Sequence, residues 1–252
     1  MTDILLQVEH LVKSYGDLTA VNDVSLAVYA GEVFGLLGPN GAGKTTTVNI
    51  CTGLLRPTSG SVSIAGILLD RDPRAAKRLI GYVPDEPYLY DKLTGREFVT
   101  FMGRLYGVSA NLDGRVDGLL RYFDLQDAAG DLIGGYSHGM RQKTALCGML
   151  VHEPRLLFLD EPTVGLDPKS ARLLKDTLQS LAANGCGVVL CTHILEIAQT
   201  ICDRVAILDR GRIIASGTVE ELRGGSDETL EDIFLRLTGT DDDRTVVSLL
   251  TP

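Results

Sequence analysis

The most constraining feature of this sequence is a glycine-rich segment that ends in lysine and threonine. Residues 38–45 read G-P-N-G-A-G-K-T and satisfy the pattern G-x-x-x-x-G-K-[ST] in full. A short continuous apolar run at residues 33–37 precedes the segment, and a helix is expected over residues 44–54. Strand, glycine loop and helix in this order form the context in which the pattern builds a phosphate-binding site. The sequence therefore predicts such a site here.

The chemistry of this loop predicts a nucleoside triphosphate with Mg²⁺ as the ligand. Glycines let backbone N–H groups converge on phosphate oxygens, and the helix N-terminus adds partial positive charge. Lys44 is expected to reach the β and γ phosphates, and the Thr45 hydroxyl to ligate Mg²⁺. The predicted binding residues are Gly38, Pro39, Asn40, Gly41, Ala42, Gly43, Lys44, Thr45 and Thr46. A dinucleotide site is excluded because no third glycine follows at the required spacing.

Two carboxylates, Asp160 and Glu161, follow a second apolar run at residues 156–159. Because open α/β sheets bind ligands at the carboxyl ends of their strands, both are expected beside the triphosphate. Asp160 is expected to hold the metal through its water shell, and Glu161 to polarise a water for attack on the γ-phosphoryl group. Hydrolysis is thus favoured over transfer. His193, after a third run at residues 187–191, is either a hydrogen-bond donor to the γ-phosphate or structural.

The order of elements predicts an α/β fold: a P-loop NTPase core with a mostly parallel sheet, a small antiparallel β layer and a helical insert. A helix is expected over residues 168–183, between the second and third apolar runs. Alternating apolar residues at 24–28 and 62–64 indicate the antiparallel layer. Residues 205–208 and 213–216 flank a turn and predict a hairpin.

Residues 88–151 form the expected insert, because apolar residues recur there at helical spacing and strand-like runs are missing. We expect one domain over residues 1–222 that includes this helical subdomain. A C-terminal helix and an acidic tail carrying Asp241, Asp242 and Asp243 are expected over residues 223–252.

Composition predicts the class of partner and the cellular location of the protein. With 24 basic and 33 acidic side chains the net charge is −9, so no nucleic-acid partner is expected. No apolar run reaches the roughly 18 residues of a membrane helix, and the first residues lack the basic region of a secretory signal. The five cysteines include no C-x-x-C pair, as expected of buried thiols in a reducing compartment. A folded cytoplasmic protein is predicted.

Residues 5–222 resemble the ATP-binding subunit of an ABC transporter, with every family motif in order. Residues 136–140 read Y-S-H-G-M where the family has its signature L-S-G-G-Q. The resemblance implies that Tyr15 stacks on adenine, and that Ser137 and Gly139 meet the γ-phosphate bound by an opposite subunit. It also implies that Asp167, in G-L-D at residues 165–167, lies in the loop that crosses the dimer axis. His193 matches the switch histidine of the family.

If the signature serves a neighbour's ATP, one chain leaves each site incomplete. The resemblance then implies a homodimer or heterodimer of ATPase subunits that closes around two ATP molecules. It further implies an integral membrane transporter subunit as partner, which would place this chain on the cytoplasmic face of the membrane. Residues 230–239 resemble the end of stand-alone ATPases from exporter-type systems.

The sequence departs from the family at two places. Asp85 stands where the family has glutamine, with Glu86 beside it, and is expected to remain a Mg²⁺ ligand because hard cations prefer oxygen. Tyr136, His138 and Met140 replace the leucine, a glycine and the glutamine of the signature. We expect ATP hydrolysis that is slower or more dependent on a partner.

Six aromatic residues lie between positions 82 and 106. They are either the core of the helical insert or anchors in a groove that accepts a helix of the membrane subunit. Two other functions stay open. One is a non-transport ATPase of the same superfamily, although tandem cassettes and long coiled coils are missing from these residues. The other is a nucleotide-dependent regulatory module with negligible hydrolysis, which the altered signature and Asp85 would explain.

Overall fold

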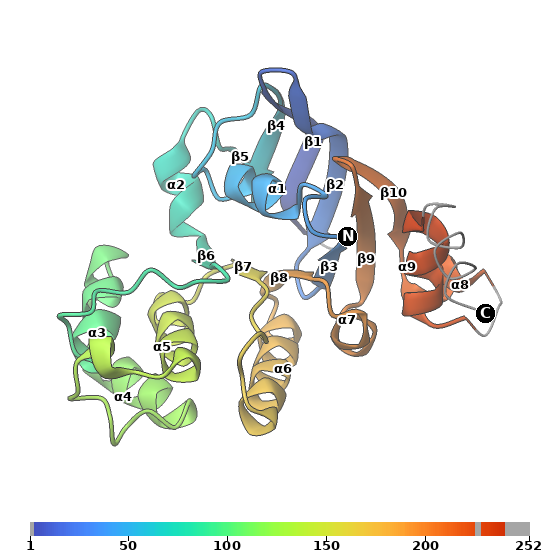
Figure 1. The fold of residues 1–252 in the computed structure, drawn as a ribbon. Coiled ribbons are helices and arrows are strands. Elements are labelled where there is room, and N and C mark those ends of the chain that lie inside the picture. Colours follow the sequence, from blue (N-terminus) through green and yellow to red (C-terminus); the bar gives the residue numbers. More distant parts are fainter. Residues whose placement is uncertain (1–2, 225–227, 240–252) are drawn as a thin grey trace.

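The computed structural model describes residues 3–224 and 228–239, and the predicted acidic tail lies outside them (Figure 1). A four-stranded antiparallel sheet has the order β2-β1-β4-β5. Its strands are β1 (Ile4–Tyr15), β2 (Leu18–Tyr29), β4 (Ser59–Ile64) and β5 (Ile67–Leu68). The small antiparallel layer predicted from alternating apolar residues is therefore confirmed.

A second sheet of six strands has the order β10-β9-β3-β8-β7-β6 and is parallel except at one edge. Its strands are β3 (Val33–Leu37), β6 (Ile80–Val83), β7 (Leu156–Asp160), β8 (Gly187–Thr192), β9 (Arg204–Asp209) and β10 (Arg212–Gly217). The antiparallel edge is the predicted β9–β10 hairpin. Its turn residues, Arg210 and Gly211, both have positive φ, at 45° and 78°, as two-residue hairpin turns require.

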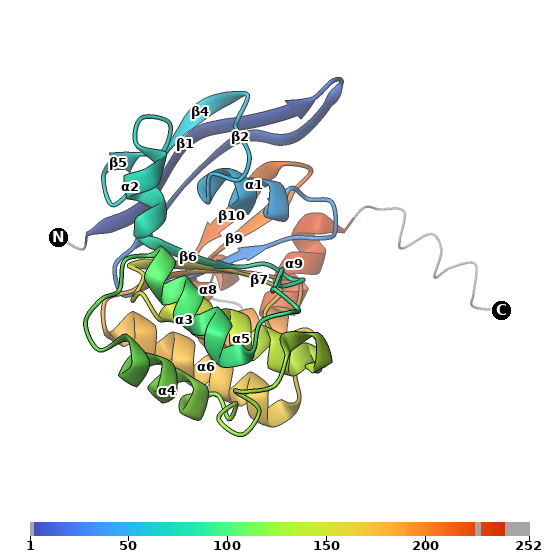
Figure 2. The same cartoon turned by 90° about the vertical axis from the view of Figure 1, so that its left-hand side faces the viewer.

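Helices cover both faces of the parallel sheet and form a separate lobe beside it. The helices are α1 (Lys44–Cys51), α2 (Pro73–Arg78), α3 (Gly95–Leu105), α4 (Leu112–Tyr122), α5 (His138–Leu150), α6 (Pro168–Ala183), α7 (Leu195–Ile201), α8 (Val219–Arg223) and α9 (Leu230–Thr238). Figures 1 and 2 show α1 between the two sheets, α6 and α7 on the opposite face, and α3 to α5 as the lobe. The helical insert expected over residues 88–151 is thus present.

Alternate residues of the parallel strands enter two different cores. Phe158 of β7 and Phe34 of β3 pack with the antiparallel sheet and α1. Leu157 and Leu159 of β7 pack instead with residues of α3 to α6. Because successive side chains of a strand point to opposite faces, a strand covered on both faces is apolar throughout. This packing explains the continuous apolar runs in the sequence.

Three local features differ from the sequence prediction. The helix expected over residues 44–54 ends at Cys51, because Gly53 takes a left-handed conformation with φ 71°. The residue pattern predicts no element at β1, β5, β6, α2, α7 or α8, all of which are present. Among the predicted buried thiols, Cys202 is half-buried and the other four cysteines are buried, and all five are free.

The C-terminal helix α9 packs on the parallel sheet. Its Leu230 and Ile233 share a core with Val205 and Ile207 of β9.

The division of the chain into domains at residue 222 stays a prediction. None of the helices in the part of the chain that the structure describes is long and apolar enough to cross a membrane.

Truncation of a core residue tests this packing. Leu157 is 0% exposed and Leu105 is 65% exposed. We expect Leu157→Ala to lower the free energy of unfolding by about 2–5 kcal/mol because it leaves a cavity between sheet and helices. The matched change Leu105→Ala should lower it by less than about 1 kcal/mol. Urea unfolding of both variants measures the difference, and equal losses would contradict the two-core packing.

Candidate functional site

A cleft of about 880 Å³ opens at the carboxyl ends of β3, β6 and β7. The glycine-rich loop and the first residues of α1 line it, together with Asp160 at the end of β7, Glu161, and residues 84–86 after β6. The cleft thus brings together three segments that are distant in the sequence. Parallel strands that end at one edge create a crevice of this kind, and ligands of α/β sheets bind there.

The loop backbone depends on glycine at position 43. Gly43 has φ 104°, and a Cβ atom there would collide with the backbone oxygen of Ala20. Lys44 is only 6% exposed, and its Nζ donates hydrogen bonds to the backbone oxygens of Gly38 at 2.7 Å and Pro39 at 3.2 Å. The ammonium group is therefore held over the loop, where phosphate oxygens would lie.

A hydroxyl and a carboxylate meet between α1 and β7. The Thr45 hydroxyl donates a hydrogen bond of 2.9 Å to Asp160 Oδ2, and Asp160 is 3% exposed. Burial raises the pKa of Asp160, and the negative charges of Glu161 and Asp85 raise it further, whereas the Thr45 hydrogen bond and Lys44 lower it. This crowding of negative charge favours a cation, and hydroxyl and carboxylate oxygens suit Mg²⁺.

Glu161 is held in an unusual backbone conformation. Its φ is 48°, and its N–H donates to the backbone oxygen of Cys191 at 2.9 Å. Its carboxylate accepts hydrogen bonds from the Thr192 hydroxyl at 3.1 Å and pairs with His193 Nδ1 at 2.8 Å. A left-handed conformation of a non-glycine residue costs about 1–3 kcal/mol and persists where neighbours enforce it, often at functional sites. Both carboxylate oxygens are thereby oriented.

Sequence reasoning identified His193 but missed Thr192, the last residue of β8. A threonine that closes an apolar run has no distinguishing neighbours, so no signal in the sequence pointed to Thr192. Sequence reasoning also missed Asn49, which lines the cleft one helical turn after Thr45.

Tyr15 and Asp85 lie on the rim of the cleft, as expected from their predicted roles. Tyr15 ends β1, is 49% exposed and lines the cleft. The ammonium of Lys13 lies over its ring, 5.0 Å from the ring centroid. Asp85 and Glu86, which follow β6, also line the cleft.

Ser137, Gly139 and Asp167 do not line this cleft. Ser137 caps α5 by accepting a hydrogen bond from the Met140 N–H at 3.3 Å, so the serine-capped helix expected from the sequence is present. Asp167 caps α6 by accepting from the Ser170 N–H at 3.0 Å. One copy of the chain therefore presents the signature away from its own phosphate loop.

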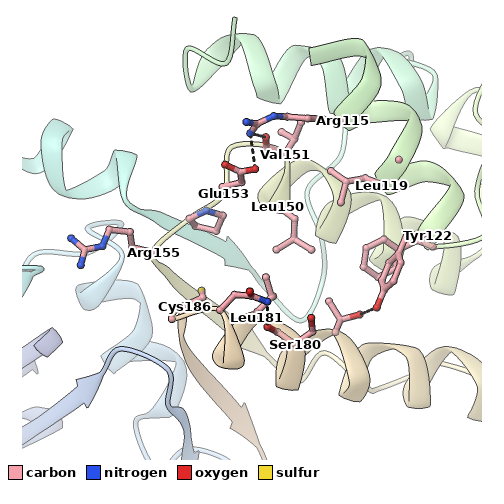
Figure 3. Close-up of a pocket in the computed structure, with 16 residues that line it drawn as sticks. Arg115, Leu119, Tyr122, Leu150, Val151, Glu153, Arg155, Ser180, Leu181 and Cys186 are labelled. Carbon is pink, nitrogen blue, oxygen red and sulfur yellow. Dashed lines mark hydrogen bonds and ion pairs between the residues drawn. The ribbon is translucent and has the colours of Figure 1, made fainter. Parts of the chain in front are cut away.

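A second cleft, of about 790 Å³, lies between α4, the loop before β7 and α6. Figure 3 shows Arg115 and Glu153 at one end and Tyr122 at the other, around apolar residues such as Leu150. Arg115 pairs with Glu153 at 3.1 Å, and the Tyr122 and Thr177 hydroxyls lie 3.2 Å apart. No glycine-rich turn opens a helix there, so this cleft does not fit a triphosphate.

Comparison with known proteins decides the family. The ABC transporter family profile matches residues 21–164. The linearmycin resistance ATP-binding protein of Bacillus subtilis is 39% identical over 230 residues, covering 90% of this chain and 74% of that protein. A daunorubicin resistance ATP-binding protein of Streptomyces coeruleorubidus is 40% identical over 240 residues, covering 95% and 76%. The chain belongs to the ABC transporter family.

Solved structures agree with this assignment. The ATP-binding subunit of an ABC transporter superposes with a TM-score of 0.89 at 36% identity, covering 92% of this chain and 99% of that one. A dimeric post-hydrolysis state of an ATP-binding cassette bound to ADP and Pi superposes with a TM-score of 0.79 at 27% identity, covering 85% and 98%. The present chain is accordingly an ABC transporter ATP-binding subunit and an ATPase with a P-loop NTPase fold.

Two glycine substitutions test the loop geometry. Gly41 and Gly43 both have positive φ, but a Cβ at Gly41 meets open space whereas one at Gly43 meets the Ala20 carbonyl. We expect Gly43→Ala to weaken ATP binding at least about tenfold more than Gly41→Ala, because only the former displaces the loop backbone. Titration with a fluorescent ATP analogue measures both, and equal weakening would contradict this account.

Proposed function

We propose that this chain binds ATP and Mg²⁺ in the cleft and pairs with a second ATP-binding subunit around two nucleotides. Through this pairing it powers export by a separate integral membrane subunit, which holds this chain on the cytoplasmic face of the membrane. The observation that carries the proposal is the joint position of Lys44, the Thr45–Asp160 pair and Glu161 at one sheet edge. The resistance names of the two relatives support export.

Each residue of the cleft has a proposed role. The phosphate loop, from Gly38 to Thr46, binds the phosphates, with Lys44 at the β and γ positions, and Tyr15 stacks on adenine. Thr45, Asp160 and Asp85 would hold Mg²⁺, which when bound neutralises charge between the β- and γ-phosphates. Glu161 orients the attacking water and accepts its proton. His193, whose Nδ1 contacts Glu161, would donate a hydrogen bond to the γ-phosphate.

Dimerisation follows from the position of the signature. Ser137 and Gly139 lie outside the cleft that Lys44 lines, so a second subunit would supply them. The N-terminus of α5 and the Ser137 hydroxyl would meet the γ-phosphate bound by the other subunit, with Asp167 near the dimer axis. ATP favours the closed pair by contacts that exist only while it is bound, and hydrolysis removes them. The dimeric relative with ADP and Pi supports this arrangement.

An exposed aromatic surface marks the proposed contact with the membrane subunit. Of the six aromatics between residues 82 and 106, Phe98 is 3% exposed in the core, whereas Tyr88 and Tyr90 are 89% and 58% exposed. Tyr90 packs edge-on against Phe101 with ring centroids 5.7 Å apart. The core interpretation thus fits Phe98, and we propose the anchor interpretation for Tyr90 and Phe101. Exposed aromatics in mutual contact, such as Tyr90 and Phe101, are typical of anchors for a partner helix.

Replacement of the proposed base tests the function. Glu161→Gln should lower ATP hydrolysis by about 10²-fold or more and retain ATP binding, because the amide keeps the shape but cannot accept the proton. Phosphate release and nucleotide titration measure the two effects. The exposed Glu196 on α7 gives the control Glu196→Gln, with an unchanged rate. Equal hydrolysis by wild type and Glu161→Gln would remove Glu161 from this role, and negligible hydrolysis by wild type would favour the regulatory module.

A charge placed on the aromatic surface tests the membrane partner. Tyr90→Asp should lower recovery with the membrane subunit by about tenfold or more, because a charge would enter an apolar contact. ATP hydrolysis by the isolated chain should not change. Leu235 on α9 is 59% exposed, so Leu235→Asp is a control of similar exposure. Co-purification from membranes measures both, and equal recovery of the two variants would remove this surface from the contact.

A further inference from the structure

His138 begins α5 at a position where the family signature has glycine, and its ring reaches another loop of the same chain. Its Nε2 lies 3.1 Å from the backbone oxygen of Val164. A carbonyl oxygen can only accept, so Nε2 carries the proton and donates the hydrogen bond. A glycine at this position has no side chain and could not make this contact.

The ring also packs against Gly165. This glycine has φ 74°, and a Cβ atom there would lie 2.7 Å from His138 Cδ2. Only a residue without a side chain allows the ring to approach so closely. The imidazole is therefore held both by a hydrogen bond and by contact with the backbone.

The contacted loop, residues 161–167, is fixed at both ends. It begins at Glu161, whose N–H is bound to the Cys191 carbonyl of β8. It ends at Asp167, which caps α6. Between these ends the Val164 N–H donates to the Glu161 carbonyl at 3.2 Å. The turn that His138 contacts therefore includes the backbone of Glu161 itself.

We propose that His138 is a positioning residue that couples the two ATP sites of the dimer. It joins the signature at Ser137, which serves the partner's nucleotide, to the Glu161 loop, which serves this chain's own nucleotide. A shift of α5 when the partner's ATP engages the signature is thereby transmitted to the Glu161 turn. This inference rests on the proposed function, because it requires two nucleotides shared between two subunits.

Three substitutions isolate the hydrogen bond. The amide nitrogen of His138→Gln lies as many bonds from Cα as the Nε2 it replaces, so this variant keeps a donor. His138→Met has the same reach without a donor, and His138→Asn keeps an amide on a shorter chain. Cooperativity and the maximal rate of ATP hydrolysis are measured on the full assembly as purified. Nucleotide affinity and the melting temperature are measured alongside.

We expect wild type and His138→Gln to hydrolyse ATP with a Hill coefficient above one. His138→Met and His138→Asn should give a Hill coefficient near one and a maximal rate about two- to tenfold lower, the range expected for one neutral hydrogen bond. Nucleotide affinity of the isolated chain should not change, because His138 lies outside its own cleft. Should His138→Met fail to fold, His138→Asn carries the same test.

Three results would overturn the inference. They are a wild-type Hill coefficient of one, unchanged cooperativity in the donor-free variant, and equal losses in His138→Gln and His138→Met. Failure of the proposed function would give a different result, namely a rate of ATP hydrolysis that Glu161→Gln does not change. A purely structural role of His138 would lower the melting temperature and leave the Hill coefficient unchanged.

Discussion

The hydrogen bond from the Thr45 hydroxyl to Asp160 joins two residues that are 115 positions apart. It forms only because β3 and β7 are parallel and end at one edge, with β8 between them. The strands in turn depend on two cores, since both faces of β3 and β7 are covered. The position of the phosphate loop relative to the carboxylates is therefore a property of the whole sheet.

The helical lobe adds a second surface that this cleft does not use. α5 presents Ser137 at its N-terminus, outside the lining of the ATP cleft. In the proposed dimer, a chain built in this way would bring its phosphate loop to one nucleotide and its signature to another. The contact of His138 with Val164 would then be the short path inside one chain between the two surfaces. The replacement of a signature glycine by His138 would then serve this coupling. From the motif alone, the replacement would be interpreted as a loss of the family signature.

Much of the site could be predicted because its residues occur in short contiguous patterns. The loop from Gly38 to Thr45, the pair Asp160 and Glu161, and His193 each follow an apolar run that became a buried strand. Thr192 was missed because a threonine at the end of a strand has no distinguishing neighbours in the sequence. β6 was missed because a four-residue strand interrupted by glycine gives a weak pattern. α1 ended earlier than expected because the left-handed conformation of Gly53 stops the helix.

The sequence by itself determined the expected chemistry: which residues are proposed to bind phosphate, which oxygens are suited to Mg²⁺, and which apolar runs become buried strands. Local spacing suffices for these properties, because a glycine loop at a helix N-terminus creates its own phosphate site. Only the tertiary structure decided that Glu161 takes a strained φ of 48° and is oriented by Thr192 and His193. It also decided that His138 contacts Val164 and that Ser137 lies outside the cleft. These features depend on how distant strands and helices pack, and no local pattern records that packing.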